Sequence, residues 1–141
     1  MRPPNRIAFA LAVTVLAVAP WTARAKKATT APISVTFEAH NEGTGEIYGE
    51  ENLVTVTIDS AGVRYQGKGM DKPYVMPWDQ IGGWQPNVFN SISPKRSSGG
   101  DFGIGIYQAR YFNFRTHNGT DFLAAVKALR KYAAEKERKG G

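Results

Sequence analysis

The 141-residue chain contains no cysteine and only two histidines. Without cysteine there is no disulfide, no thiolate metal ligand, no haem attachment, no cysteine nucleophile and no lipid-anchoring cysteine, so packing alone must hold the core. The two histidines, His40 and His117, have no paired acid at a spacing that would indicate a catalytic site, and no G-x-S-x-G stretch occurs. The sequence therefore predicts a protein that is not an enzyme, with no catalytic residue, no metal site and no cofactor.

The N-terminal stretch has the form of a secretory signal peptide. A positively charged start precedes an uncharged apolar run over residues 7–19, and Ala23 and Ala25 form an A-x-A cleavage motif. An apolar run of that length gives about 20 Å of helix, which is shorter than the roughly 30 Å hydrocarbon core of a membrane. We therefore expect residues 1–25 to be removed as a signal peptide, and the remaining chain to be periplasmic or secreted.

Basic residues are concentrated at the two ends of the expected mature chain. Lys26 and Lys27 open it, and six lysines and arginines lie between residues 127 and 139. The body between residues 28 and 126 has ten acidic and seven basic residues, and this balance repels phosphate backbones. We expect no binding of nucleic acid, and at most a weak membrane contact through the basic face of the last segment.

Alternating apolar and polar residues predict seven short strands after a lead-in over residues 26–32. The predicted strands occupy residues 33–39, 53–59, 63–67, 74–78, 83–89, 102–108 and 110–116. In the sixth of these, Gly103 and Gly105 alternate with apolar residues. Glycines at such positions predict that another element or a ligand lies close against that face of the sheet.

The last segment changes from the period of a strand to that of a helix. Phe122, Val126 and Leu129 recur at helical spacing, and Asn118 is suited to be the N-cap. We expect this amphipathic helix to pack its apolar stripe on the sheet. Residues 135–141 are expected to form a basic tail beyond it.

The stretch VMPWDQIGGW, residues 75–84, predicts a tight corner between two strands rather than an aromatic platform for a ligand. Pro77 removes a ladder donor where the strand must stop, and Gly82–Gly83 are expected to let the chain reverse. Trp78 and Trp84 are expected to bracket the corner, with at least one of them packed beneath it.

The order of these elements resembles a pleckstrin-homology-like (PH-like) domain of the small bacterial type. Two stretches carry the resemblance: IDSAGVRYQG…YVMPWDQIGGW, similar to that family's strand, turn, strand and I-P-W-x-x-I corner, and YFNFRTHNGTDFLAAVKAL, similar to its final strand and closing helix. The resemblance implies a mainly β fold over residues 33–134, a seven-stranded antiparallel, partly open barrel with one C-terminal α-helix.

Phosphoinositide-binding members of that family gather basic residues around their first strands and the loop between them. The corresponding loop of this chain has no basic residue and carries four acidic ones, Glu42, Glu46, Glu50 and Glu51. The departure from the family's pattern predicts that this chain does not bind phosphoinositides.

The polar loop NSISPKRSSGGD, residues 90–101, is the segment in which we expect an interaction site. It combines cations, hydroxyls and glycine amides, which suit an anion or a polar partner, although it lacks the spacing of a P-loop. The candidate residues are Ser93, Lys95, Arg96, Ser97, Ser98 and Asp101.

We expect a non-enzymatic exported module that binds another envelope or secreted protein through an open strand edge or the loop over residues 90–101. Two alternatives stay open. One is a carrier that holds a small molecule or a lipid inside the barrel, and the bulky inward residues Phe37, Phe102, Phe112 and Phe114 argue against it. The other is a hydrolase of unrecognised type. The fold alone does not decide among these three functions.

Overall fold

A computed structural model of the protein describes residues 32–43, 45–91, 93 and 99–140. The predicted signal peptide, with its cleavage residues Ala23 and Ala25, lies outside the described residues, and so does all of the lead-in except Pro32. The same holds for a run of the predicted interaction loop, Lys95, Arg96, Ser97 and Ser98.

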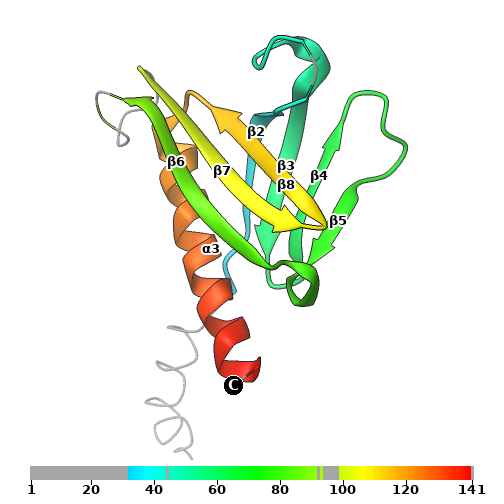
Figure 1. The fold of residues 1–141 in the computed structure, drawn as a ribbon, viewed down its shortest axis with the longest axis vertical. Coiled ribbons are helices and arrows are strands. Elements are labelled where there is room, and N and C mark those ends of the chain that lie inside the picture. Colours follow the sequence, from blue (N-terminus) through cyan, green and yellow to red (C-terminus); the bar gives the residue numbers. More distant parts are fainter. Residues whose placement is uncertain (1–31, 44, 92, 94–98, 141) are drawn as a thin grey trace, which may run out of the picture. The chain divides into compact units, whose positions relative to one another are not determined.

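The described chain forms one antiparallel sheet and one α-helix (Figure 1). The elements are β2 (Val35–Asn41), η1 (Glu50–Asn52), β3 (Leu53–Asp59), β4 (Gly62–Gly67), β5 (Tyr74–Pro77), η2 (Trp78–Gln80), β6 (Gly83–Ser91), β7 (Gly100–Gln108), β8 (Arg110–Thr116) and α3 (Gly119–Gly140). The strands follow the order β5-β4-β3-β2-β8-β7-β6 across the sheet. The mainly β fold with seven antiparallel strands and a C-terminal helix is confirmed.

The alternation of apolar residues decides which face of the sheet is buried. On β3, the side chains of Val54, Val56 and Ile58 are buried, while Thr55 between them is exposed. The register places residues of the buried set opposite one another, as in the pair of Val56 and Tyr65. Each strand thus contributes one apolar face to a common core.

The sheet curls into a half-barrel, and at the curl β2 and β8 pair only at their ends, through His40 with Arg115 and Asn41 with Phe114. Figure 1 shows β6, β7 and β8 crossing the strands β3 and β4 at a steep angle. Bulky side chains fill the interior of the curl. The four phenylalanines that were predicted to point inward are all buried: Phe37, Phe102, Phe112 and Phe114.

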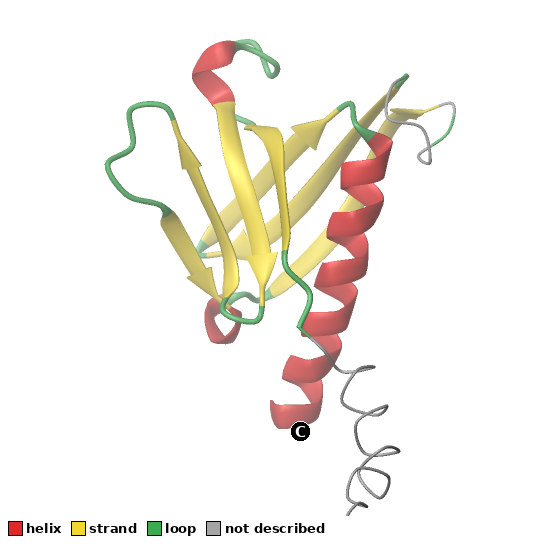
Figure 2. Cartoon of the chain, turned by 180° about the vertical axis from the view of Figure 1, so that it is seen from behind, coloured by secondary structure: helices red, strands yellow, loops and turns green. Residues whose placement is uncertain are grey.

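The helix α3 lies along the half-barrel and covers part of its apolar face (Figure 2). Asn118 caps it as predicted, since its Oδ1 accepts a hydrogen bond from the backbone N–H of Asp121 at 3.0 Å. Phe122 stacks on Phe102 with ring centroids 4.8 Å apart. The helix also includes most of the segment that we expected to form a basic tail, residues 135–141. It continues to Gly140, so residues 135–140 are helical rather than a separate tail.

The corner predicted for residues 75–84 is present, but glycine is not what makes it. Pro77 ends β5, and the chain turns through η2, where the indole N–H of Trp78 donates to the backbone oxygen of Asp59 at 2.8 Å. Trp78 and Trp84 are both partly buried against the core. Neither Gly82 nor Gly83 has a positive φ, so the 3-10 turn itself reverses the chain.

Candidate functional site

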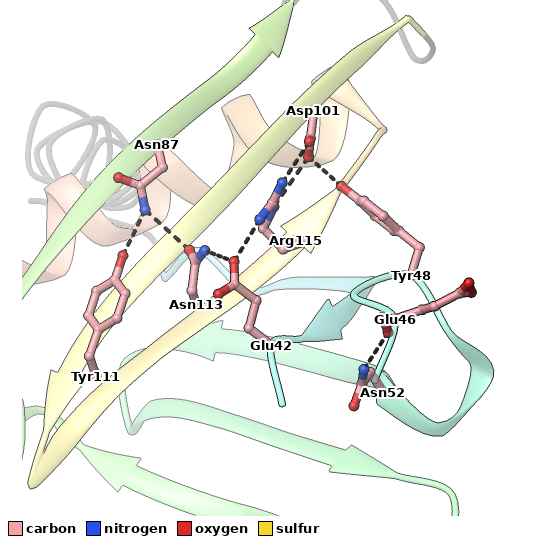
Figure 3. A network of polar contacts seen from close by, with 9 residues as sticks. All are labelled: Glu42, Glu46, Tyr48, Asn52, Asn87, Asp101, Tyr111, Asn113 and Arg115. Atoms are coloured by element: carbon pink, nitrogen blue, oxygen red, sulfur yellow. Dashed lines mark hydrogen bonds and ion pairs between the residues drawn. The ribbon is translucent and has the colours of Figure 1, made fainter. Parts of the chain in front are cut away.

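The candidate site is a polar network on the outer face of the sheet, which is the face of β6, β7 and β8 turned away from the core (Figure 3). It exists because β8 alternates: Phe112 and Phe114 point into the core, and Asn113 and Arg115 therefore point outward. The loop between β2 and β3, which carries Glu42 and Tyr48, adds its side chains to this network (Figure 3).

Arg115 is the centre of the network. Its guanidinium binds Asp101 of β7 in a bidentate manner, from Nη2 to Oδ2 at 2.6 Å and from Nε to Oδ1 at 3.2 Å. Its Nη1 donates to Oε2 of Glu42 at 2.7 Å. The Arg115 side chain is only 8% exposed, and the ring of Phe89 lies over it at 3.8 Å. One buried cation is thus held by two carboxylates and an aromatic ring.

Tyr48 attaches the β2–β3 loop to this centre. Its hydroxyl donates to Oδ1 of Asp101 at 2.6 Å. The Tyr48 ring stacks on His117 with centroids 3.9 Å apart and makes a T-shaped contact with His40, with centroids 5.1 Å apart. His117 in turn has its Nδ1 within 2.6 Å of the backbone oxygen of Gly100. Both histidines therefore pack around one tyrosine ring, which they help to position.

The network continues across β8 to β6 through amide side chains. Nδ2 of Asn113 donates to Oε2 of Glu42 at 2.6 Å. Nδ2 of Asn87 donates to Oδ1 of Asn113 at 3.2 Å and to the hydroxyl of Tyr111 at 2.8 Å. Three strands, β6, β7 and β8, and the β2–β3 loop are thereby joined by side-chain hydrogen bonds, which fixes their relative positions.

The two glycines of β7 make room for this layer of side chains. A Cβ atom on Gly103 would lie 2.6 Å from Oδ1 of Asn113, and one on Gly105 would lie 2.4 Å from the hydroxyl oxygen of Tyr111. The close approach that the glycines predicted is therefore made by side chains of the neighbouring strand.

The surroundings of the network shift the pKa values of Asp101 and Tyr48. Burial alone would raise the pKa of the Asp101 carboxyl, but hydrogen bonds from Arg115 and Tyr48 and the guanidinium charge outweigh it, and the pKa lies below its usual value. Burial and the bond to Asp101 raise the pKa of Tyr48. An aspartate whose ionised form is favoured by arginine is a poor proton acceptor.

Burial also acts on His40, the histidine at the edge of the Tyr48 ring. Its pKa is lowered, first by burial and then by the neighbouring His117, against an opposing effect of Glu38. Its surroundings therefore disfavour the charged form of the imidazole.

Of the six candidate residues of the predicted interaction loop, the structure describes Ser93 and Asp101. Asp101 belongs to β7, and its carboxylate is bound by Arg115 and Tyr48. Ser93 is half-buried. Sequence reasoning missed Glu42, Tyr48 and Arg115. The available signal was an arginine that follows Phe114 near the end of an alternating strand, downstream of an acidic loop.

Next to the network, β6 forms one end of the sheet and carries exposed apolar side chains. A bulge between Val88 and Asn90 leaves Phe89 without a partner on β7. The side chain of Val88 is 60% exposed and that of Phe89 is 50% exposed. The bulge directs Phe89 over Arg115, so this ring joins the polar network to the free edge.

Comparisons with protein-family models, with curated proteins and with solved structures found no match to this chain. The PH-like family therefore stays a prediction, and function has to be inferred from the described residues themselves. Within those residues, no cluster of three or more histidine, aspartate and glutamate side chains is arranged to hold a metal ion. No helix in the described part of the chain is both long and apolar enough to cross a membrane.

Proposed function

We propose that this protein is a non-enzymatic, exported binding module of PH-like type, which recognises another envelope or secreted protein along strand β6. The observation that carries the proposal is a long, uncharged sheet edge with an exposed aromatic ring, Phe89, which packs on the fixed guanidinium group of Arg115.

The edge itself is the first part of the argument. Of the strands described, β6 pairs only with β7, and none of its nine residues, GWQPNVFNS, is charged. Folded proteins usually protect free edges with charge, proline, bulges or short length. The opposite edge, β5, has only four residues. Along β6, Pro86 and the bulge limit non-specific pairing, but charge does not oppose a partner of matching shape.

The second part is the rigidity of the apolar anchor. Phe89 lies over Arg115, and the guanidinium is fixed by Asp101 and Glu42. A side chain that is already held in one position loses little conformational entropy when a partner covers it. Buried aromatic anchors of this kind account for much of the binding energy of protein interfaces. Half-exposed Phe89, with Val88 beside it, is suited to that role.

The interior of the half-barrel supports binding at the surface rather than inside. Phe102 and Phe114 are fully buried there, together with Ile104, which is paired with Phe114 across β7 and β8. A carrier of a small molecule or a lipid requires an internal space that these side chains already occupy.

Affinity capture from the organism's own envelope fraction tests the proposal, with the wild-type protein compared with Val88→Lys. A lysine on the edge strand opposes pairing with another strand. The matched control is Val75→Lys on β5, since Val75 is 48% exposed on the other edge. We expect a partner that is captured by the wild type and by Val75→Lys and is lost with Val88→Lys. Equal recovery with both lysine variants would refute the β6 site.

Export is tested separately by the intact mass of the protein recovered from that fraction. The proposal predicts a chain that begins at Lys26, because cleavage follows Ala25. A chain that still begins at Met1 would contradict it.

A further inference from the structure

A cleft lies between the C-terminal end of α3 and the corner at η2. Its volume is about 420 Å³, within the range of roughly 300–1,000 Å³ that is common for small-molecule sites. None of its lining residues belongs to β6 or to the polar network of the outer face. It is therefore a different site from the edge proposed above.

Two aromatic rings, Trp78 and Tyr132, line this cleft, with centroids 5.7 Å apart. Their polar atoms are engaged elsewhere. The indole N–H of Trp78 donates to the backbone oxygen of Asp59 at 2.8 Å. The Tyr132 hydroxyl accepts from the backbone N–H of Ile33 at 2.9 Å and donates to the backbone oxygen of the same residue. The rings therefore offer the cleft their apolar surfaces and no free polar atom.

The charged side chains around the cleft leave an excess of positive charge. The carboxylate of Glu135 is already paired with Lys131, at 2.8 Å. The ammonium of Lys136 is bonded to the neutral backbone oxygen of Ile81, which leaves its charge uncompensated. Lys139 lines the cleft less than one turn further along α3 and makes no hydrogen bond or ion pair with the described residues.

One acid acts against this excess. Asp79 of η2 also lines the cleft, and its carboxylate makes no ion pair with the part of the chain that is described. Two ammonium groups thus stand against one unpaired carboxylate. The carbonyl end of α3, at Gly140, adds a partial negative charge that reduces the excess further without reversing it, so an anion is still favoured over a cation.

We propose that this cleft binds a small aromatic carboxylate. Its ring packs against Trp78 and Tyr132, and its carboxylate lies between the ammonium groups of Lys136 and Lys139. Aromatic contact supplies affinity through buried apolar area, while a charge-assisted hydrogen bond from lysine selects the carboxylate.

The experiment follows the indole N–H signals of the exported protein by NMR while 1-naphthoate is added. Trp21 lies within the predicted signal peptide, so Trp78 and Trp84 give the two indole signals, and Trp78→Phe assigns them. We expect a saturable shift of the Trp78 signal at sub-millimolar to millimolar naphthoate, with the Trp84 signal changed less. The neutral analogue 1-naphthamide, which has the same rings, is expected to bind about three- to tenfold more weakly.

Charge variants locate the carboxylate. Lys139→Gln is expected to weaken naphthoate binding by about three- to tenfold, and Asp79→Asn to strengthen it by about twofold. The control is Lys127→Gln on the exposed side of α3, for which we expect no change. The proposal is overturned if no saturable shift occurs, if naphthamide binds as tightly as naphthoate, or if Lys127→Gln weakens binding as much as Lys139→Gln. None of these results bears on β6, which shares no residue with the cleft.

Discussion

Replacing Arg115 by methionine removes the cation at the centre of the outer-face network and keeps much of its apolar volume. The substitution leaves the carboxylates of Asp101 and Glu42 without their partner and takes the guanidinium from under Phe89. Removing one member of a fully buried ion pair costs about 3–5 kcal/mol. Here the Asp101 and Glu42 side chains are 25% and 38% exposed and regain some hydration. We therefore expect a loss of about 2–3 kcal/mol in the free energy of unfolding.

Urea unfolding at pH 7 measures this loss directly, with Arg110→Met as the control on the same strand. Arg110 lies over the ring of Phe112 at 3.9 Å and makes no ion pair with the described residues, so its replacement is expected to cost less than about 1 kcal/mol. A second comparison uses pH. The lowered pKa of Asp101 means that its contribution is present above the unfolded value of about 3.9 and is lost as the pH falls through the folded value.

The difference between the wild type and Arg115→Met should accordingly shrink below about pH 4. Equal stability of Arg115→Met and the wild type at pH 7 would show that the network contributes nothing net. A difference that stays constant down to pH 2.5 would show that the Asp101 pair is not its source.

Three further changes test other parts of the fold. Because burial and His117 lower the pKa of His40, the wild type should lose stability as the pH falls below about 6.5. His40→Gln should lose less stability than the wild type between pH 7.5 and 5.0, as measured by urea unfolding. Gly103→Ala should lower the free energy of unfolding by about 1–3 kcal/mol because its Cβ meets the buried, hydrogen-bonded Asn113. Gly105→Ala should lower it less because the exposed Tyr111 can swing away. Equal melting temperatures of the two variants would contradict this reasoning. Asn118→Ala should cost about 1 kcal/mol through the lost N-cap, and rescue by Asn118→Ser or Asn118→Asp would identify the cap as the cause.

The strands and the helix could be predicted because their signals are local. Alternation along β3 reports directly that one face of that strand is buried, and the helical spacing of Phe122, Val126 and Leu129 reports one buried stripe. A cap such as Asn118 acts within one turn. Each of these patterns lies within a short stretch of the sequence, so the elements can be predicted without knowing how they pack.

The polar network could not be predicted because its contacts join residues far apart in sequence. Arg115 occupies an outward position of an alternating strand, where a solvated side chain is the ordinary expectation. It is buried because the β2–β3 loop and Phe89 cover it. The bulge that directs Phe89 there is set by the pairing of β6 with β7 and leaves no mark in the sequence.

The glycines show the same limit at the level of the backbone. A Gly-Gly pair suggests positive φ angles, yet Gly82 and Gly83 have none. Gly62, in the hairpin between β3 and β4, does have one, with φ of 141°. A Cβ on Gly62 would also lie 2.2 Å from the backbone oxygen of Met76 on β5. Only the paired strand reveals why glycine is needed at that position.

The most direct test of the central claim is site-specific photo-cross-linking in the living cell. A photoreactive amino acid replaces Val88 on β6 in one variant and Val75 on β5 in the other, two exposed valines on opposite edges of the sheet. Binding along β6 predicts a discrete cross-linked adduct with an exported protein from position 88 and none from position 75. The absence of an adduct at position 88, or the same adduct from both positions, would contradict it.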